Sequence, residues 1–299
     1  IAVPVLVIGK AGGLGGFGDQ VATVNPELLN IFTNAKGESL SILEIVSLLG
    51  WGLGYFGLPH VLARFKAIRS ADDVGIATAI GVSWSFVGYL MAILVGLCGT
   101  VYLADPLVDS ERVFIELTGL IFHPIIAGVL LAAILAAIMS TVDSQLLVCS
   151  ATLAEDLYPM FVKQSLTAEK RLQIGRIAVV ALALLATVLA MKPDSKVLDV
   201  VSYAWAGLGA SLGPAILLSL YWRGMSAAGA LAGILVGGGT VIIWEALGSS
   251  GYNSGIFGLF SLVPGFTFSL IAVFLVTRWG GETENPEVLE QFDRMRNAL

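Results

Sequence analysis

The sequence Gly-Trp-Gly-Leu-Gly-Tyr-Phe-Gly-Leu-Pro, at positions 50–59, interrupts a long apolar run. In a helix interior, glycine costs about 1 kcal/mol and proline about 3 kcal/mol relative to alanine. Four glycines and a proline within ten residues therefore disfavour a continuous helix. We predict a helix that starts near residue 40 and breaks within this stretch.

The composition of the whole chain is that of a membrane protein. Hydrophobic residues make up 57% and charged residues 13% of 299 residues, with a mean hydropathy of +0.88, whereas soluble domains are about 25% charged. Roughly 20 apolar residues in a helix cross a bilayer with every backbone group satisfied. We therefore predict an all-α polytopic membrane protein. An apolar stub at 1–9 precedes spans at 40–58, 75–103, 124–152, 174–191, 198–222, 227–247 and 256–277.

Inside a bilayer, the break at 50–59 requires protein or a water-filled cavity to satisfy the freed backbone groups. In transporters, such breaks are where substrates bind. Trp51 and Tyr55 are four residues apart, so in a helix they would share one face and form an aromatic wall. The alternative interpretation is a glycine-rich packing surface with interfacial aromatic residues.

The predicted span at 124–152 carries three hydroxyl groups on one helix face. Sodium is a hard cation that takes oxygen ligands, and helix carbonyls with Ser and Thr hydroxyls supply them. The alternative is close helix packing through small residues, with hydroxyls bonded back to their own helix. The residues of this face, at positions i, i+3, i+4 and i+7, are Ala137, Ser140, Thr141 and Ser144.

Asp143 lies next to this face, well inside the apolar run. A carboxylate at that depth costs on the order of 2.5–3.5 kcal/mol on insertion scales. Its side chain is therefore expected to face a cavity, a cation or a hydrogen-bond donor.

The basic residues predict the topology, because Lys and Arg gather in cytoplasmic loops. With alternating loops assigned to two sides, eleven lie on one side and five on the other, which places the C-terminus in the cytoplasm. The larger set is Arg64, Lys66, Arg69, Lys163, Lys170, Arg171, Arg176, Arg223, Arg278, Arg294 and Arg296; the smaller is Lys10, Lys36, Arg112, Lys192 and Lys196.

The chain shows no pattern of an enzyme or of a cofactor site. Cys98 and Cys149 lie in apolar spans, and His60 and His123 stand at span ends without acids at ligand spacing. No nucleophile with a base and an orienting acid can be assembled from them. We expect no enzyme activity, no organic cofactor and no nucleic-acid partner, and the partners expected are the bilayer and a small solute.

Two segments outside the predicted spans carry weaker patterns. Residues 10–39 are rich in Gly, Asn and acidic residues, which predicts an outer loop. We expect this loop to be most flexible at positions 12–18, which contain five glycines. The run 110–117 begins with a capping Ser110 and has an apolar face, which predicts a short amphipathic helix on the outer surface.

Several motifs of the sequence, and their order along the chain, resemble the sodium/solute symporter family. The resemblance is nearest to the family's members that carry proline. The resemblance runs from about residue 1 to 279. Its motifs are the stretch at 50–60 with Ala63-Arg64-Phe65, 136–141 followed by 145–150 and 155–158, 111–116, 201–207, and 221–223 with 229–233.

The resemblance implies a fold of two inverted five-helix repeats of the leucine-transporter type. It makes 1–9 the end of core helix 5, 10–39 an extracellular loop and 40–222 core helices 6–10, the second repeat. It also makes 223–277 two peripheral transmembrane helices and 278–299 a cytoplasmic tail. The first repeat is expected to be missing from the N-terminal side of this sequence, which starts inside an apolar run.

The resemblance also implies the ligands. It makes Ala137, through its carbonyl, and Ser140 and Thr141, through their hydroxyls, ligands of Na⁺, with the remaining ligands on the missing first core helix. It assigns Trp51, Tyr55 and Pro59 to substrate binding and gating.

One residue and one residue pair depart from the family's pattern. Leu58 stands where, in the family, a glutamine often follows the Tyr-Phe-Gly motif. The pair Asp143-Ser144 replaces a Ser-Cys pair found in some members that carry proline. Ser144 keeps a hydroxyl on the ion face, and Asp143 is either a further cation partner or part of a second ion site.

The function implied by the resemblance is sodium-coupled symport of a small solute, with L-proline favoured, by alternating access in the cell inner (plasma) membrane. Pantothenate, another carboxylate or a sugar are alternative solutes. A transporter-like module of a sensor is the alternative of a different class.

Overall fold

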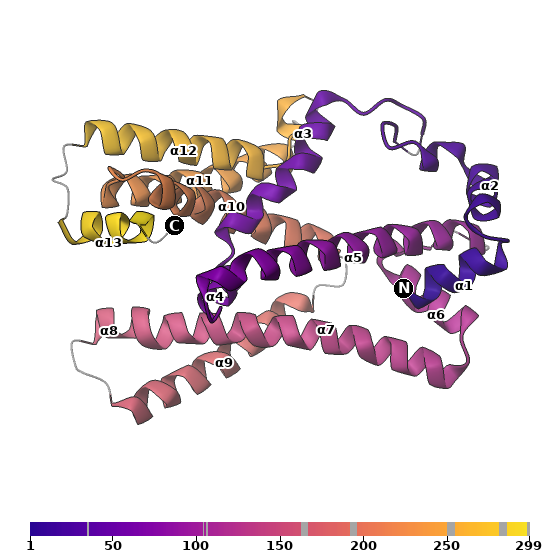
Figure 1. Cartoon of the computed structure of the whole chain (residues 1–299), viewed down its shortest axis with the longest axis horizontal. Helices are drawn as coiled ribbons and strands as arrows, with labels where there is room; N and C mark the ends of the chain where they lie inside the picture. Colours follow the sequence, from indigo (N-terminus) through magenta and orange to yellow (C-terminus); the bar gives the residue numbers. More distant parts are fainter. Residues whose placement is uncertain are drawn as a thin grey trace. The chain divides into compact units, whose positions relative to one another are not determined.

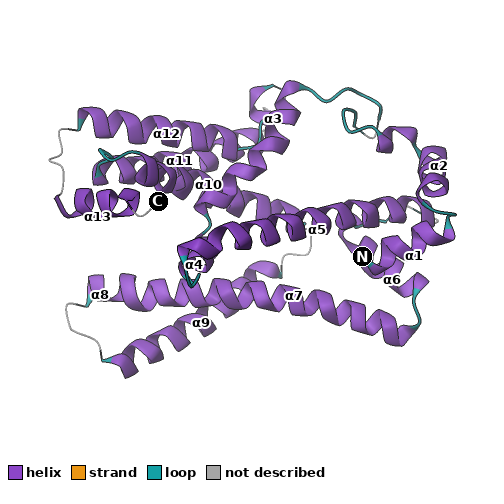
Figure 2. Cartoon of the chain, in the orientation of Figure 1, coloured by secondary structure: helices purple, strands orange, loops and turns teal. Residues whose placement is uncertain are grey.

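The computed structural model is built from helices (Figure 2). It describes residues 1–34, 36–103, 105, 107–162, 167–191, 196–249, 255–280 and 286–297. Within these ranges the only β pairing is one isolated bridge between Thr33 and Ser39. The chain forms two compact units, the first of residues 1–40 and 66–194 and the second of 41–65 and 195–299.

Six described helices are long and apolar enough to cross a membrane, and a bent helix pair brings the number to seven. This agrees with the seven predicted spans and confirms an all-α polytopic membrane protein. The six are α5 (Val74–Tyr102), α7 (Pro124–Ala151), α9 (Ala168–Ala190), α10 (Val197–Tyr221), α11 (Ala227–Ser249) and α12 (Leu262–Trp279). A π-helical segment, η5 (Thr152–Leu157), and α8 (Tyr158–Phe161) prolong α7 beyond its predicted end.

The core of the first unit gathers four helices. They are α1 (Ala2–Lys10), α2 (Leu14–Val24), α6 (Val113–Ile121) and the second half of α5. Val7, Val21, Cys98 and Leu117 are fully buried in this cluster. The apolar stub at the start of the sequence is therefore a packed helix, and buried Cys98 has a packing role.

Two sequence predictions in this unit were wrong in detail. The glycine-rich part of the predicted outer loop is mostly helical, as α2, because Phe17 and Val21 stand four residues apart and bury one face in the core. Ser110 is not the cap of the predicted helix but the first residue of a 3₁₀ turn, η4 (Ser110–Arg112), that leads into α6. Asp109 caps this turn, since its carboxylate accepts a hydrogen bond of 3.0 Å from the backbone N–H of Glu111.

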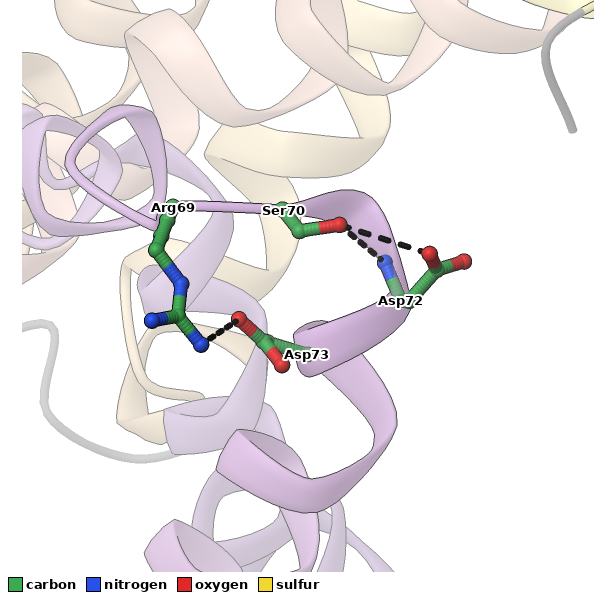
Figure 3. A network of polar contacts seen from close by, with 4 residues as sticks. All are labelled: Arg69, Ser70, Asp72 and Asp73. Carbon is green, nitrogen blue, oxygen red and sulfur yellow. Dashed lines mark hydrogen bonds and ion pairs between the residues drawn. The ribbon is translucent and has the colours of Figure 1, made fainter.

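A 3₁₀ turn, η3 (Ala71–Asp73), leads into α5 and is capped by Ser70 (Figure 3). The Ser70 hydroxyl accepts a hydrogen bond of 3.2 Å from the backbone N–H of Asp72 and lies 3.4 Å from its carboxylate. Asp72 and Asp73 also place negative charge at the positive end of the helix dipole. The Arg69–Asp73 ion pair, at 3.5 Å, is exposed and adds little.

The second unit begins with the bent pair. Helix α3 (Ile42–Gly50) continues as a 3₁₀ segment, η2 (Trp51–Gly57), before α4 (Pro59–Lys66) starts at an angle of 58°. Leu58, directly before the proline, is extended, with φ −91° and ψ 109°, as the proline ring requires of the residue before it. The break predicted at 50–59 is confirmed.

Glycines let η2 approach α10 closely. A Cβ on Gly57 would strike the backbone carbonyl of Leu208, and one on Gly209 would lie 2.7 Å from the Cα of Gly54. Neither contact leaves room for a methyl group. The break is therefore held by direct packing of backbone on backbone.

Helices α10, α11 and α12 pack side by side (Figure 1). Their shared core consists of buried Ala206, Ala210, Val241, Leu262 and Phe266. The small residues at this contact, Ala206 and Ala210, let the helix backbones approach closely. Close approach stabilises the bundle, because van der Waals packing drives helix association in membranes.

A last helix, α13 (Pro286–Asn297), is tied to the end of α10. The Arg223 guanidinium donates two hydrogen bonds of 2.9 Å to the two carboxylate oxygens of Asp293. These bonds hold the pKa of Asp293 below its ordinary value. The bidentate geometry connects residues 70 positions apart.

The glycine contact predicts that Gly57→Ala destabilises the protein while Gly52→Ala does not. Overpacking costs typically about 1–3 kcal/mol, and the obstacle at Gly57 is backbone, which cannot swing away. A Cβ on Gly52 meets nothing within 4 Å. Thermal unfolding of the purified variants measures the difference, and equal midpoints for Gly57→Ala and the unmodified protein would contradict the contact.

The Arg223–Asp293 bond predicts that acid releases α13. A carboxyl group whose pKa is lowered on docking favours the docked state at neutral pH, and this contribution is lost as the pH falls below about 4 and through the lowered pKa. Asp293→Asn should release the helix already at pH 7. Hydrogen exchange of the amides in 286–297, corrected for the intrinsic rates, reports the release.

The matched control is Glu290→Gln, which removes only the ion pair with Arg294 inside α13. Its amides should keep the protection of the unmodified protein. Protection unchanged in Asp293→Asn would show that the ion pair does not hold the helix.

Candidate functional site

Two of the predicted sodium ligands of α7, the hydroxyls of Ser140 and Thr141, bond to the third, the carbonyl of Ala137. The Ser140 hydroxyl donates a hydrogen bond of 2.8 Å to the carbonyl oxygen of Ala137, and the Thr141 hydroxyl donates one of 3.3 Å to the same atom. Ser144 repeats the pattern one turn later, with a bond of 2.8 Å to the Thr141 carbonyl. Helix geometry alone thus brings three oxygen atoms together.

This arrangement agrees with hydroxyls bonded back to their own helix and leaves their oxygens able to act as ligands. A hydroxyl that donates its hydrogen still carries two lone pairs. Ala137, Ser140 and Thr141 are exposed within their unit, and Ser144 is half-buried. The face can therefore accept a cation or a further donor from outside the unit.

Asp143 stands three residues after Ser140, on the exposed side of α7. Among the residues that the structure describes, its carboxylate makes no hydrogen bond and no ion pair.

In the second unit, the aromatic residues of η2 are organised by Trp205 of α10. The indole N–H of Trp205 donates a hydrogen bond of 3.0 Å to the backbone carbonyl of Trp51. The ring of Tyr55 meets the Trp205 ring edge-on, with centroids 4.8 Å apart. On the other side, Trp51 stacks on Phe260 at 5.0 Å. Edge-on and offset pairs of this kind are stabilising.

Trp51 and Tyr55 do not share a helix face as their spacing predicted for an α-helix. A 3₁₀ helix has about three residues per turn, so positions four apart are separated by about 120° around the axis. The Trp205 ring contacts both side chains instead. The wall is thus a cluster of four rings, of which sequence reasoning found two.

Trp205 and Phe260 were missed as site residues. Trp205 lies in the motif at 201–207, which contributed only to the family resemblance, and its spacing from Trp51 carries no periodic signal. Pro59 begins α4 and is half-buried, while Leu58 before it is buried, with 3% of its surface exposed. Leu58, one of the departures from the family's pattern, is therefore packed in the interior.

The oxygen face belongs to the first unit and the aromatic cluster to the second. Each is held by contacts within its own unit. A many-span helical membrane protein with a broken span lined by aromatic rings, and a second span with an oxygen face, has the features expected of a secondary transporter.

The sequence matches the profile of the Sodium:solute symporter family over residues 1–237. The chain belongs to this family. The resemblance drawn from the motifs is confirmed.

Three curated relatives are similar over nearly the whole chain. The "High-affinity proline transporter PutP" of Bacillus subtilis is 45% identical over 100% of the chain. The "Osmoregulated proline transporter OpuE" of the same organism is 42% identical over 93%, and the "Sodium/proline symporter" of Escherichia coli is 42% identical over 94%. The chain spans only 61% of the length of the first relative and 55% of the other two. No solved structure matches the chain significantly.

Proposed function

We propose that this chain is part of a carrier that couples the inward movement of Na⁺ to the uptake of L-proline. The observation that carries the proposal is the family membership, together with relatives at 42–45% identity that are named for proline transport. The carrier is a multi-pass protein of the cell inner membrane with a cytoplasmic C-terminus, and it catalyses no chemical reaction.

The sodium ion is assigned to the oxygen face of α7. The carbonyl of Ala137 and the hydroxyls of Ser140 and Thr141 lie within one helical turn, and both hydroxyls hold their hydrogens toward the carbonyl. The lone pairs of the two hydroxyl oxygens are then available to the cation, and the Ala137 carbonyl becomes available when the hydroxyl hydrogens turn away from it. Ser144 adds a hydroxyl one turn further along α7. Asp143 adds the negative charge that balances Na⁺.

These groups are too few to surround the ion, since hard cations in proteins take about six oxygen ligands. The remaining ligands are assigned to a segment outside this chain, because the relatives are longer than the part that the chain matches. In the leucine-transporter type of fold, this segment is the first core helix. The described helices then take the roles of the second inverted repeat, with α3, η2 and α4 as its broken sixth helix.

Proline is assigned to the aromatic cluster at the break. Trp51 and Tyr55 present ring faces and edges that suit an apolar five-membered ring, and the T-shaped contact with Trp205 holds Tyr55 in place. Pro59 starts the helix that leaves the break at 58° and is assigned to gating, because its fixed φ sets the direction of α4.

The coupling follows from differential binding. Sodium stabilises only the conformation that it binds more tightly, and proline affinity rises if the aromatic cluster binds proline in that same conformation. Reciprocity requires that proline raise the sodium affinity by the same factor.

The first test removes one sodium ligand at a time. Ser140→Ala and Thr141→Ala, made in the complete gene product, should each raise the sodium concentration for half-maximal proline uptake, by about tenfold for a ligand worth about 1.4 kcal/mol. Radiolabelled proline uptake at varied sodium, in cells without other proline carriers, measures the change.

The matched control is Thr187→Ala in α9, because the Thr187 hydroxyl is likewise bonded back to its own helix, at 2.8 Å from the carbonyl of Ala183. It should leave the sodium dependence unchanged. Unchanged dependence in Ser140→Ala and Thr141→Ala would overturn the assignment.

The second test separates the solute from the ion. Trp51→Ala or Tyr55→Ala should raise the half-saturating concentration of proline, by about tenfold for lost stacking and area of about 1.4 kcal/mol, with a smaller change in sodium dependence. Competition of pantothenate and sugars against labelled proline, in the same assay, tests the choice of solute. Phe268→Ala, at an exposed ring of α12, is the control.

An equal loss of proline and sodium affinity in Trp51→Ala or Tyr55→Ala would instead indicate a general folding defect. Stronger competition by pantothenate or a sugar than by unlabelled proline would reassign the solute.

A further inference from the structure

A cavity of about 380 Å³ lies in the second unit. It is bounded by the last turns of α11, the short η6 (Ile256–Gly258) and the start of α12. Its volume is at the lower end of the range of small-molecule sites, roughly 300–1,000 Å³. The cavity is therefore large enough for a compact solute.

One side of the cavity carries a fixed carboxylate. The hydroxyl of Ser261, which is 1% exposed, donates a hydrogen bond of 2.6 Å to Glu245. A carboxylate has about four acceptor positions, so Glu245 can accept further bonds from a guest. Among the described residues, no basic side chain lies within ion-pair distance of Glu245. Its charge is open to a cation.

Three aromatic residues, Trp244, Phe257 and Phe260, also line the cavity. The rings of Trp244 and Phe257 lie 4.9 Å apart and are tilted by 52°. The Trp244 indole is held in place because its N–H donates a hydrogen bond of 2.9 Å to the carbonyl of Leu259. Ring faces attract organic cations, most strongly those of tryptophan. A carboxylate beside tilted rings is the environment that suits an ammonium group.

Phe260 connects this cavity to the aromatic cluster at the break. Its ring lines the cavity and stacks on Trp51 at 5.0 Å, with an interplanar angle of 14°. Its backbone N–H donates a hydrogen bond of 2.9 Å to the hydroxyl of Ser47 in α3. A ligand in the cavity would thus lie one ring away from Trp51.

We propose that this cavity is an accessory site that binds the ammonium group of the transported amino acid, with Glu245 as its counter-ion and Trp244 and Phe257 as its aromatic wall. The identity of the guest rests on the proposed function, whereas the preference for an organic ammonium group rests on the cavity alone. A solute held here lies beside Phe260, whose ring stacks on Trp51 of the aromatic cluster.

The test uses the complete gene product, labelled with 5-fluorotryptophan and reconstituted in lipid nanodiscs in potassium buffer without sodium. Trp244→Phe assigns the fluorine resonance of Trp244. Titration with tetramethylammonium chloride, and separately with proline, should shift this resonance. In Glu245→Gln the apparent affinity for either probe should fall by about tenfold or more, because glutamine carries no charge to attract a cation.

Glutamine keeps the acceptor for the Ser261 hydroxyl, so Glu245→Gln removes the charge and leaves the local packing intact. The control is Glu169→Gln, at an exposed carboxylate of α9, which should bind both probes as the unmodified protein does. A Trp244 resonance that does not move, or that moves equally in Glu245→Gln, would overturn the proposal.

The titration also separates the two proposals, because it needs neither sodium nor transport. Proline uptake combined with a silent Trp244 would contradict the cavity site alone. A responsive Trp244 in a protein that takes up no proline would contradict the proposed function and leave the ammonium site supported.

Discussion

The second unit depends on the close approach of η2 to α10. Gly54 and Gly57 meet Gly209 and the Leu208 carbonyl at distances that no side chain permits. A bilayer offers no water to the backbone groups that a broken helix exposes, so a break survives only where protein or a cavity covers it. The glycine contact places α10 against the broken segment.

The same contact organises the aromatic residues. With η2 pressed on α10, the Trp205 indole N–H donates a hydrogen bond to the carbonyl of Trp51 in the broken segment, and its ring meets Tyr55. Phe260 extends the cluster toward the cavity beside Glu245. One packing constraint thus positions both the wall assigned to proline and the proposed ammonium site.

The oxygen face of α7 has a simpler origin. An α-helix brings residues three and four apart onto one side, so Ala137, Ser140 and Thr141 converge without help from other elements. Sequence spacing could therefore predict their arrangement. The cation site itself needs ligands beyond these, and the exposure of the face in its unit is consistent with that need.

The membrane class, the seven spans, the break at 50–59 and the family could be predicted from the amino-acid sequence, because apolar length, helix-breaking residues and long motifs are local properties. That the glycine-rich segment before residue 25 is helical became clear only from its packing, since burial of Phe17 and Val21 outweighs its low helix propensity. The tertiary structure also shows that Trp205 and Phe260 join Trp51. Rings 154 and 209 residues away meet Trp51 only through packing, which no periodicity along the chain encodes.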